Sequence, residues 1–214
     1  MARAASTGPR RAPRRPPGPR RREAVHDRRR VEQGVRAFLE GIGRARLGGE
    51  FESTVARVTE TWCDELLRGY AEEPAAILTP IPIRPGRGWV VARDLPFASL
   101  CVHHLLPFFG RAHIVFLPGR SLVGLSKLAR LVDCFSRRLQ MQEALTRQVL
   151  EALTRHLRPR GAAVLLEAEH LCMSVRGVRS QGSRVLTAAF SGSLERDAGR
   201  REAVLRLLGV RPPA

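Results

Sequence analysis

Cysteine and histidine side chains that can bind a metal ion fall into two short clusters of this 214-residue chain. The first cluster holds Cys101, His103 and His104, and the second holds His170 and Cys172. Zinc prefers thiolate sulfur and imidazole nitrogen, and a catalytic zinc site keeps three protein ligands and an open fourth position. Cys101, His104 and Cys172 make such a set, which leaves His103 and His170 for proton transfer. Because the clusters lie far apart in the chain, the fold must assemble this predicted zinc site.

The remaining cysteines and histidines are isolated along the chain. Cys63 and Cys134 are interpreted as small buried hydrophobes, and His26, His113 and His156 as structural residues. The basic N-terminus is not followed by an apolar segment, so it does not read as a secretory signal. Five prolines there also argue against a helical transit peptide. We therefore expect a reducing, cytoplasmic environment, in which clustered cysteines are metal ligands more often than disulfides.

Basic residues near a predicted helix start could hold phosphate groups. Ser126 is expected to cap this helix and Lys127 follows it, where backbone N–H groups and the helix dipole favour an anion. Arg130 lies one turn on, and Arg176 follows Cys172 by four residues. A solvated basic helix start is the alternative. Lys127 is nevertheless the only lysine in the chain, which hints at a site that needs an ammonium group.

A neighbouring amide and carboxylate, Gln142 and Glu143, lie in the next predicted helix. A carboxylate can accept two hydrogen bonds from the N1–H and 2-amino edge of guanine. Taken alone, such a pair is more often a surface feature than a base-binding site.

The positioning elements follow from hydrophobic spacing. Residues 1–30 form an Arg/Pro-rich tail that is expected to be disordered, because it has little to bury. Residues 31–88 hold two predicted helices and a Pro-rich connector, and residues 89–209 read as an α+β domain of order ββ-αα-ββ. Residues 210–214 are the C-terminal end. The expected strands cover residues 89–93, 112–117, 162–169 and 184–191. Between the second and third strands, one helix is expected to begin at residue 126 and a further helix to end at about residue 157. A short helix is expected over residues 202–208.

The net charge of +17 invites a nucleic-acid interpretation. Eleven of the 37 basic residues lie in residues 1–30, however, and that segment has no aromatic residue to stack on bases. The bias of arginine over lysine also suggests a general coding bias. Nucleic acid is therefore not an expected partner. No apolar run approaches about 18 residues, so we expect no membrane span.

Four segments in order resemble the GTP cyclohydrolase I family. They are Cys101–Gly110, Gly124–Arg130, Arg137–Thr146 and His170–Gly177. The resemblance implies the tunnelling fold, in which a ββαα-ββ antiparallel sheet carries two helices on one face, with N-terminal helices ahead. It also implies a ring-forming homo-oligomer, a pentamer or decamer, with sites between subunits.

The family's roles carry over residue by residue. Its zinc ligands fall on Cys101, His104 and Cys172, and its catalytic histidines on His103 and His170. The family's guanine-binding pair falls on Gln142 and Glu143. Its phosphate- and ribose-contacting groups fall on Ser126, Lys127, Arg130 and Arg176. An arginine of its N-terminal helix, also linked to the triphosphate, falls on Arg57. Ser126 would share proton transfer with His103.

The implied activity is zinc-dependent hydrolysis and rearrangement of GTP to 7,8-dihydroneopterin triphosphate and formate, the first step of pterin or tetrahydrofolate biosynthesis. Two positions depart from the family pattern: Val102 replaces a glutamate, and Glu60 replaces a phosphate-binding lysine. A diverged paralogue that acts on another purine nucleotide or stops at the formamide stage is one alternative. A non-catalytic binding or regulatory subunit is another.

Overall fold

The computed structural model describes residues 26–43, 48–84, 86 and 88–210. Most of the tail predicted for residues 1–30, and residues 211–214 of the C-terminal end, lie outside the described residues. Arg28–Arg30 form the first turn of helix α1 (Arg28–Gly41), so the helix begins three residues ahead of the predicted boundary. Its start is capped by Asp27, whose carboxylate accepts a hydrogen bond from the Arg30 N–H at 3.1 Å.

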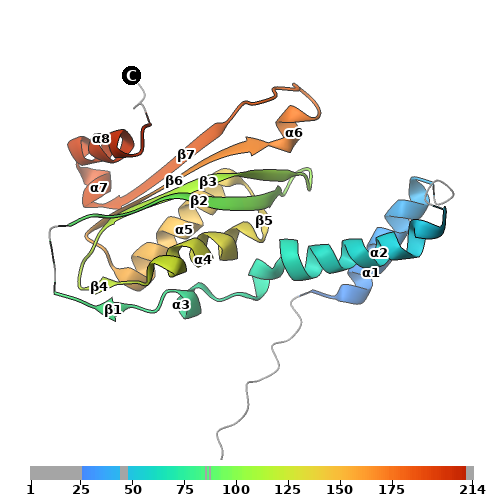
Figure 1. Cartoon of the computed structure of the whole chain (residues 1–214), viewed down its shortest axis with the longest axis horizontal. Helices are drawn as coiled ribbons and strands as arrows, with labels where there is room; N and C mark the ends of the chain where they lie inside the picture. The colour runs from blue at the N-terminus through green and yellow to red at the C-terminus, as the bar shows by residue number, and fades with distance from the viewer. Residues whose placement is uncertain (1–25, 44–47, 85, 87, 211–214) are drawn as a thin grey trace, which may run out of the picture.

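The N-terminal helices project beyond one end of the sheet (Figure 1). A 3-10 turn, η2 (Gly48–Glu50), leads into α2 (Phe51–Glu60), which packs on α1 through Leu39, Phe51 and Val55. The second of the two helices predicted within residues 31–88 changes its winding after Glu60. It continues as a π-helical segment, η3 (Thr61–Leu66), then as a 3-10 turn, η4 (Arg68–Ala71), and a short α3 (Pro74–Ile77).

Gly69 explains how this segment meets the main domain. A Cβ at this position would lie 2.1 Å from the Cys134 carbonyl oxygen, so only glycine allows the close approach. The Gly69 N–H donates to the Arg137 carbonyl oxygen at 3.0 Å, which joins η4 to the end of α4 (Leu125–Ser136).

The main domain is built on a five-stranded sheet of order β5-β2-β3-β6-β7. Its strands are β2 (Val90–Cys101), β3 (Pro107–Leu117), β5 (Leu139–Gln140), β6 (Gly161–His170) and β7 (Val185–Gly192). All neighbours are antiparallel except β2 and β5, which pair in parallel. Two further strands, β1 (Ile81–Pro82) and β4 (Ser121–Leu122), pair separately. The predicted order ββ-αα-ββ is confirmed, within a mixed α+β architecture.

Strand β2 is longer than the run predicted over residues 89–93. Its register with β3 shifts between Ala92 and Leu95, where Asp94 takes a left-handed conformation with φ of 56°. This irregularity and Pro96 break the alternation of apolar residues. Strand pairing nevertheless carries β2 on to Cys101, which places that residue at the strand's end.

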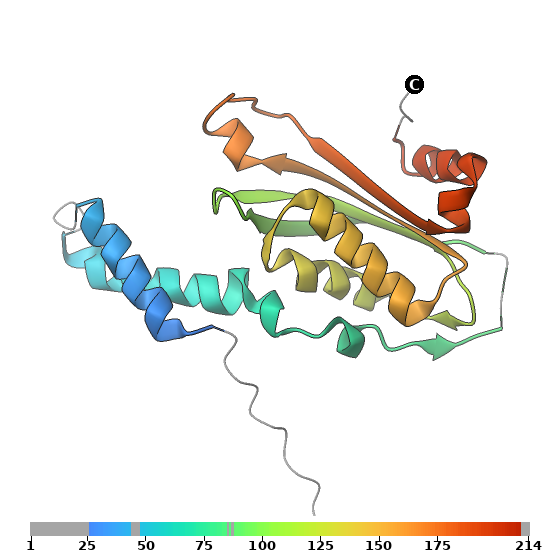
Figure 2. The ribbon, with the colours of Figure 1, turned by 180° about the vertical axis from the view of Figure 1, so that it is seen from behind.

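Helices cover both faces of the sheet (Figures 1 and 2). As predicted, α4 and α5 (Gln142–Leu157) share one face, where Leu131 and Leu153 belong to the same buried core as Phe116 of β3. The opposite face carries α7 (Ser193–Arg196) and α8 (Ala198–Leu207), where Leu194 belongs to the same buried core as Leu117 of β3. Because successive side chains of a strand point to opposite faces, neighbouring residues of β3 serve both cores.

The start of α4 corrects one prediction. The N-cap is Gly124, and Ser126 lies inside the first turn without capping it. None of the described helices is long and apolar enough to cross a membrane.

Candidate functional site

The first cysteine–histidine cluster occupies the turn between β2 and β3. Cys101 ends β2, and its N–H donates to the Leu106 carbonyl oxygen at 2.9 Å, while the Leu105 N–H donates to the Cys101 carbonyl oxygen at 2.8 Å. This tight turn brings both histidine side chains to the cysteine. The Cys101 Sγ lies 3.9 Å from the His103 Nδ1 and 3.8 Å from the His104 Nδ1.

The second cluster reaches this turn through sheet pairing. Strand β6 pairs with β3 so that His170 lies opposite Phe108, and the short helix α6 (Leu171–Ser174) follows at once. Potential ligand atoms of Cys101, His104 and Cys172 consequently lie within 4.8 Å of one another. The predicted three-residue set therefore comes together in the folded chain.

The chemistry of this group fits a zinc ion. Ligand atoms of a tetrahedral zinc site are about 3.3–3.8 Å apart, given bonds of about 2.0–2.3 Å, so only a small contraction is needed. Burial raises the pKa of the Cys172 thiol, and the neighbouring Cys101 raises it further. Two neighbouring thiolates repel each other, so both thiols ionise readily only when a bound cation lies between them.

His170 lies beside the metal-ligand group and is held on two sides. Its ring stacks on Phe108 with centroids 4.6 Å apart and planes 2° from parallel. Its Nε2 lies 2.7 Å from the Gln142 Oε1 at the start of α5. Burial lowers the pKa of His170, and the Glu143 carboxylate opposes this shift. Burial therefore favours the neutral imidazole, while the Glu143 carboxylate favours its charged form.

The orientation of the Gln142 amide decides which His170 nitrogen carries the proton. The Gln142 Nε2 donates to the carbonyl oxygens of Leu166 and Val185, both at 2.9 Å, and contacts the Thr187 hydroxyl at 3.1 Å. These three groups accept hydrogen bonds, so the amide nitrogen must face them and the amide oxygen must face His170. The His170 Nε2 is consequently the donor, which leaves Nδ1 as the free nitrogen.

Two threonines complete this network. The Thr187 hydroxyl lies 2.6 Å from the Thr146 hydroxyl, which donates to the Gln142 main-chain carbonyl oxygen at 2.8 Å. The sequence analysis missed both threonines. Gln142 and Thr146 lie one helical turn apart, and this spacing is the one sequence signal that indicates a contact between these two residues. The Gln142 side chain is 2% exposed, and its polar atoms are all engaged within the chain. Its predicted role in purine binding stays a prediction.

Other predicted residues lie on the surface or elsewhere in the chain. Glu143 is exposed in the first turn of α5, and Arg176 is exposed just after α6. Arg57 is exposed on α2, one turn before the exposed Glu60. Val102, which stands where the family has a glutamate, is 43% exposed in the turn after β2.

The basic residues of α4 lie away from the metal-ligand group. Helix α4 starts after β4, at the Leu117 end of β3, whereas α6 lies at the Phe108 end (Figures 1 and 2). Strand β3 has 11 residues, which corresponds to roughly 35 Å. A single chain thus does not bring the start of this helix to the candidate metal-ligand group. The residues concerned are Ser126, Lys127 and Arg130.

Comparisons with known proteins agree on one family. The family model described as GTP cyclohydrolase I matches residues 31–209. A protein named GTP cyclohydrolase 1 from Bartonella henselae is 46% identical over 170 residues, which cover 78% of this chain and 82% of the relative. Proteins of the same name from Pelotomaculum thermopropionicum and Carboxydothermus hydrogenoformans are 39% and 38% identical. They cover 86% and 87% of this chain, and 98% and 97% of their own length.

Proposed function

The chain belongs to the GTP cyclohydrolase I family and is a hydrolase of that type, and from this premise we propose that it is a zinc enzyme that converts GTP to 7,8-dihydroneopterin triphosphate and formate. The observation that carries the proposal is the convergence of Cys101, His104 and Cys172 beside His170. The product would enter pterin or tetrahydrofolate synthesis in the cytoplasm.

Zinc is the metal that best suits this donor set. Two thiolates and one imidazole are soft and borderline ligands, and three protein ligands leave a position for water or substrate. Cys101, His104 and Cys172 would hold the zinc ion. It would lower the pKa of a water molecule and so supply a nucleophile near neutral pH.

His170 moves a proton at Nδ1, because its Nε2–H is engaged by Gln142. It takes up the proton released by the water that attacks C8 and delivers it to the imidazole-ring nitrogen of the purine as that ring opens. The nearby Glu143 carboxylate stabilises the charged imidazolium that forms between these steps. Gln142 acts as a positioning residue, since its anchored amide holds the ring against rotation.

The remaining roles concern substrate binding and the later steps. The Glu143 carboxylate accepts hydrogen bonds from the N1–H and 2-amino groups of guanine. His103 and Ser126 exchange protons during ribose opening and rearrangement. The triphosphate is held by cations at the start of α4 and elsewhere, namely Lys127, Arg130, Arg176 and Arg57.

A ring of subunits with the tunnelling fold accounts for the distance, within one chain, between the start of α4 and the candidate metal ligands. Since α4 starts far from α6, the Ser126–Arg130 segment of one subunit serves the metal site of another. We propose a pentamer or decamer on this ground. Sedimentation analysis of the purified chain tests the assembly, and an active monomer would contradict it.

The reaction itself is tested with purified, zinc-loaded protein and GTP. Formate release and pterin fluorescence after oxidation are followed together between pH 6 and 9, with the Cys172→Ala variant as a matched control. Equal amounts of formate and pterin support the proposal. A formamidopyrimidine product would instead indicate a truncated reaction, consistent with Val102 and Glu60. No turnover would favour a non-catalytic subunit.

A further inference from the structure

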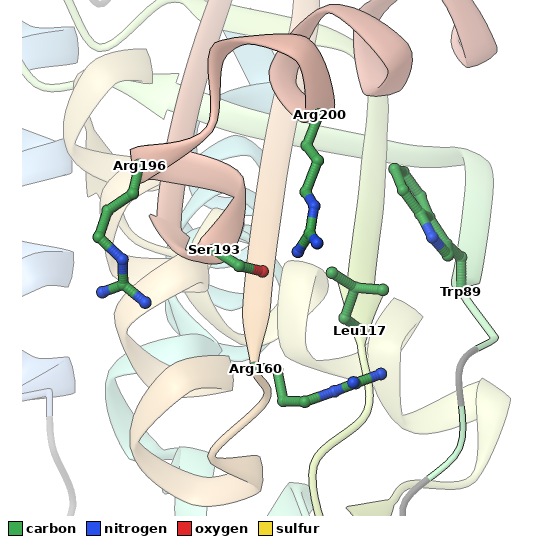
Figure 3. A pocket seen from close by; sticks show the side chains of 6 residues that line it. All are labelled: Trp89, Leu117, Arg160, Ser193, Arg196 and Arg200. Carbon is green, nitrogen blue, oxygen red and sulfur yellow. The ribbon is translucent and has the colours of Figure 1, made fainter.

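A cavity of about 700 Å³ lies at the other end of the sheet from the metal-ligand group. Figure 3 shows its lining, which joins the end of β3, the residue before β6 and the two C-terminal helices. The lining residues are Trp89, Leu117, Arg160, Ser193, Arg196 and Arg200. Strand β6 has 10 residues between this end and His170, so roughly 30 Å separate the cavity from the site described above.

The lining is strongly cationic. It contains three arginines and no acidic residue. The Arg160 guanidinium donates to the main-chain carbonyl oxygens of Pro118 at 3.1 Å and Gly86 at 2.5 Å. Arg200 forms an ion pair with Asp197 at 3.1 Å, at a half-exposed position. Within the described part of the chain, no carboxylate lies within ion-pair distance of Arg160 or Arg196, so positive charge in the cavity is largely uncompensated.

A buried hydroxyl group also faces this space. The Ser193 Oγ is the one buried side-chain oxygen or nitrogen without a hydrogen-bond partner in the described residues. In Figure 3 this hydroxyl and the Arg200 guanidinium point into the same region beside Leu117. Buried polar groups are normally hydrogen-bonded, so an unpaired hydroxyl beside cations indicates a missing partner that can accept a hydrogen bond.

Two paired glycines build this corner. Gly161 of β6 lies opposite Gly192 of β7, and Gly192 has a φ of 61°. The turn they allow lets the Ser193 N–H donate to the Arg160 carbonyl oxygen at 2.9 Å. A Cβ on Gly161 would lie 2.6 Å from the Ser193 Oγ, so glycine leaves the hydroxyl its place. The arrangement of hydroxyl and arginine is thus set by the backbone.

We propose that this cavity is a second anion site, which binds a polyphosphate attached to an aromatic ring, as in a nucleoside triphosphate. Arginine forks and a hydroxyl are suited to phosphate oxygens. The Trp89 indole, which is 38% exposed, offers a face for the ring. The volume lies in the range of sites for ligands of this size. The inference is independent of the proposed reaction, because it uses none of its residues.

Fluorescence of Trp89 tests the proposal directly. The chain has two tryptophans, so a Trp62→Phe background makes Trp89 the sole reporter. Zinc-loaded protein is titrated with inorganic tripolyphosphate and, separately, with ATP. Both are expected to bind and change the emission, and ATP more tightly, because only ATP adds a ring to stack on Trp89. Binding of tripolyphosphate with no gain for ATP would overturn the aromatic part of the proposal.

Variants locate the binding site. Arg196→Gln and Arg200→Gln should each weaken ATP binding by about tenfold or more, since each removes a charged hydrogen-bond donor. Ser193→Ala should weaken it less. Arg206→Gln on α8, which pairs with Glu202 and lies outside the cavity, is the matched control. An unchanged affinity in both cavity variants, or no Trp89 response to either probe, would overturn the proposal.

The same titration separates this site from the proposed catalytic one. Lys127→Gln removes a predicted triphosphate contact of the reaction and lies on α4, outside this cavity. It should leave the Trp89 response unchanged while GTP turnover falls. A lost Trp89 response in this variant would mean that the cavity belongs to the catalytic site, and would overturn the independence of the two.

Discussion

Replacing Gln142 by methionine tests whether its buried amide holds His170. Methionine keeps the length of the side chain but removes its oxygen and nitrogen. Two carbonyl oxygens and the His170 Nε2–H then lose a buried hydrogen-bond partner. At the low end of about 1 kcal/mol for each of the three groups, the variant loses about 3 kcal/mol of stability. For a chain of this length, that corresponds to a melting temperature lower by about 6–12 °C.

The same substitution should separate positioning from substrate binding. Without the amide oxygen, the His170 ring loses its fixed orientation, so kcat for GTP should fall by about 10- to 100-fold while KM changes little. Thermal unfolding is followed at fixed protein and zinc concentrations, because assembly and metal both shift the melting temperature. Steady-state kinetics are measured well below that temperature.

Gln148→Met is the matched control. Gln148 lies on the same helix, and its Oε1 accepts one hydrogen bond, from the Gln140 Nε2 at 3.0 Å. It does not contact His170, so kcat should stay near that of the unchanged chain and the melting temperature should fall by only a few degrees. A Gln142→Met protein with normal kcat and a raised KM would refute the positioning role and favour direct purine binding. A melting temperature equal to the control's would refute the energetic argument.

Three further predictions concern pH, metal and turnover. Burial lowers the pKa of His113 below its usual value of about 6.5, so the unfolded chain binds its proton more readily. The stability of the folded chain should therefore fall as pH drops below about 6.5. The His113→Asn variant keeps an acceptor for the Asp94 N–H but has no group that titrates in this range. Its melting temperature should therefore depend less on pH in melting curves recorded between pH 5 and 7.5. Parallel curves would contradict that account. Cys172→Ala should lose zinc and activity together, whereas His170→Ala should keep zinc and lose at least about 100-fold in activity. Metal analysis distinguishes them, and loss of zinc in His170→Ala would overturn the ligand assignment. Val102→Glu should raise kcat, because a carboxylate next to the ligands can orient them or relay protons; unchanged or lower turnover would indicate a different adaptation at this position.

Local pattern was sufficient for the main elements. The spacing of Leu145, Val149, Leu153 and Leu157 predicts the amphipathic helix that α5 forms. Strand ends were harder, because Asp94 and Pro96 interrupt the alternation of β2 and only pairing with β3 continues it to Cys101. Local pattern also did not reveal the change of winding after Glu60 or the close approach of Gly69 to Cys134, which lies far along the chain.

Some residues of the candidate site could be predicted from the sequence, whereas others could not. Residue type and clustering narrowed the candidate metal ligands to five cysteines and histidines, because few side chains bind zinc. The fold then brings the potential ligand atoms of Cys101, His104 and Cys172 together. Type and spacing could not reveal the buried Gln142 amide, since its partners are carbonyl oxygens that every residue possesses.

The sequence by itself determined the family, the order of strands and helices and the chemistry of the candidate metal ligands, because these depend on residue identity and short-range periodicity. The tertiary structure decided which His170 nitrogen is free and that α4 starts away from α6. It also decided that the Ser193 hydroxyl lies beside arginine side chains without a hydrogen-bond partner among the described residues. These depend on which main-chain groups and distant side chains strand pairing brings together. That information exists only once the sheet has formed.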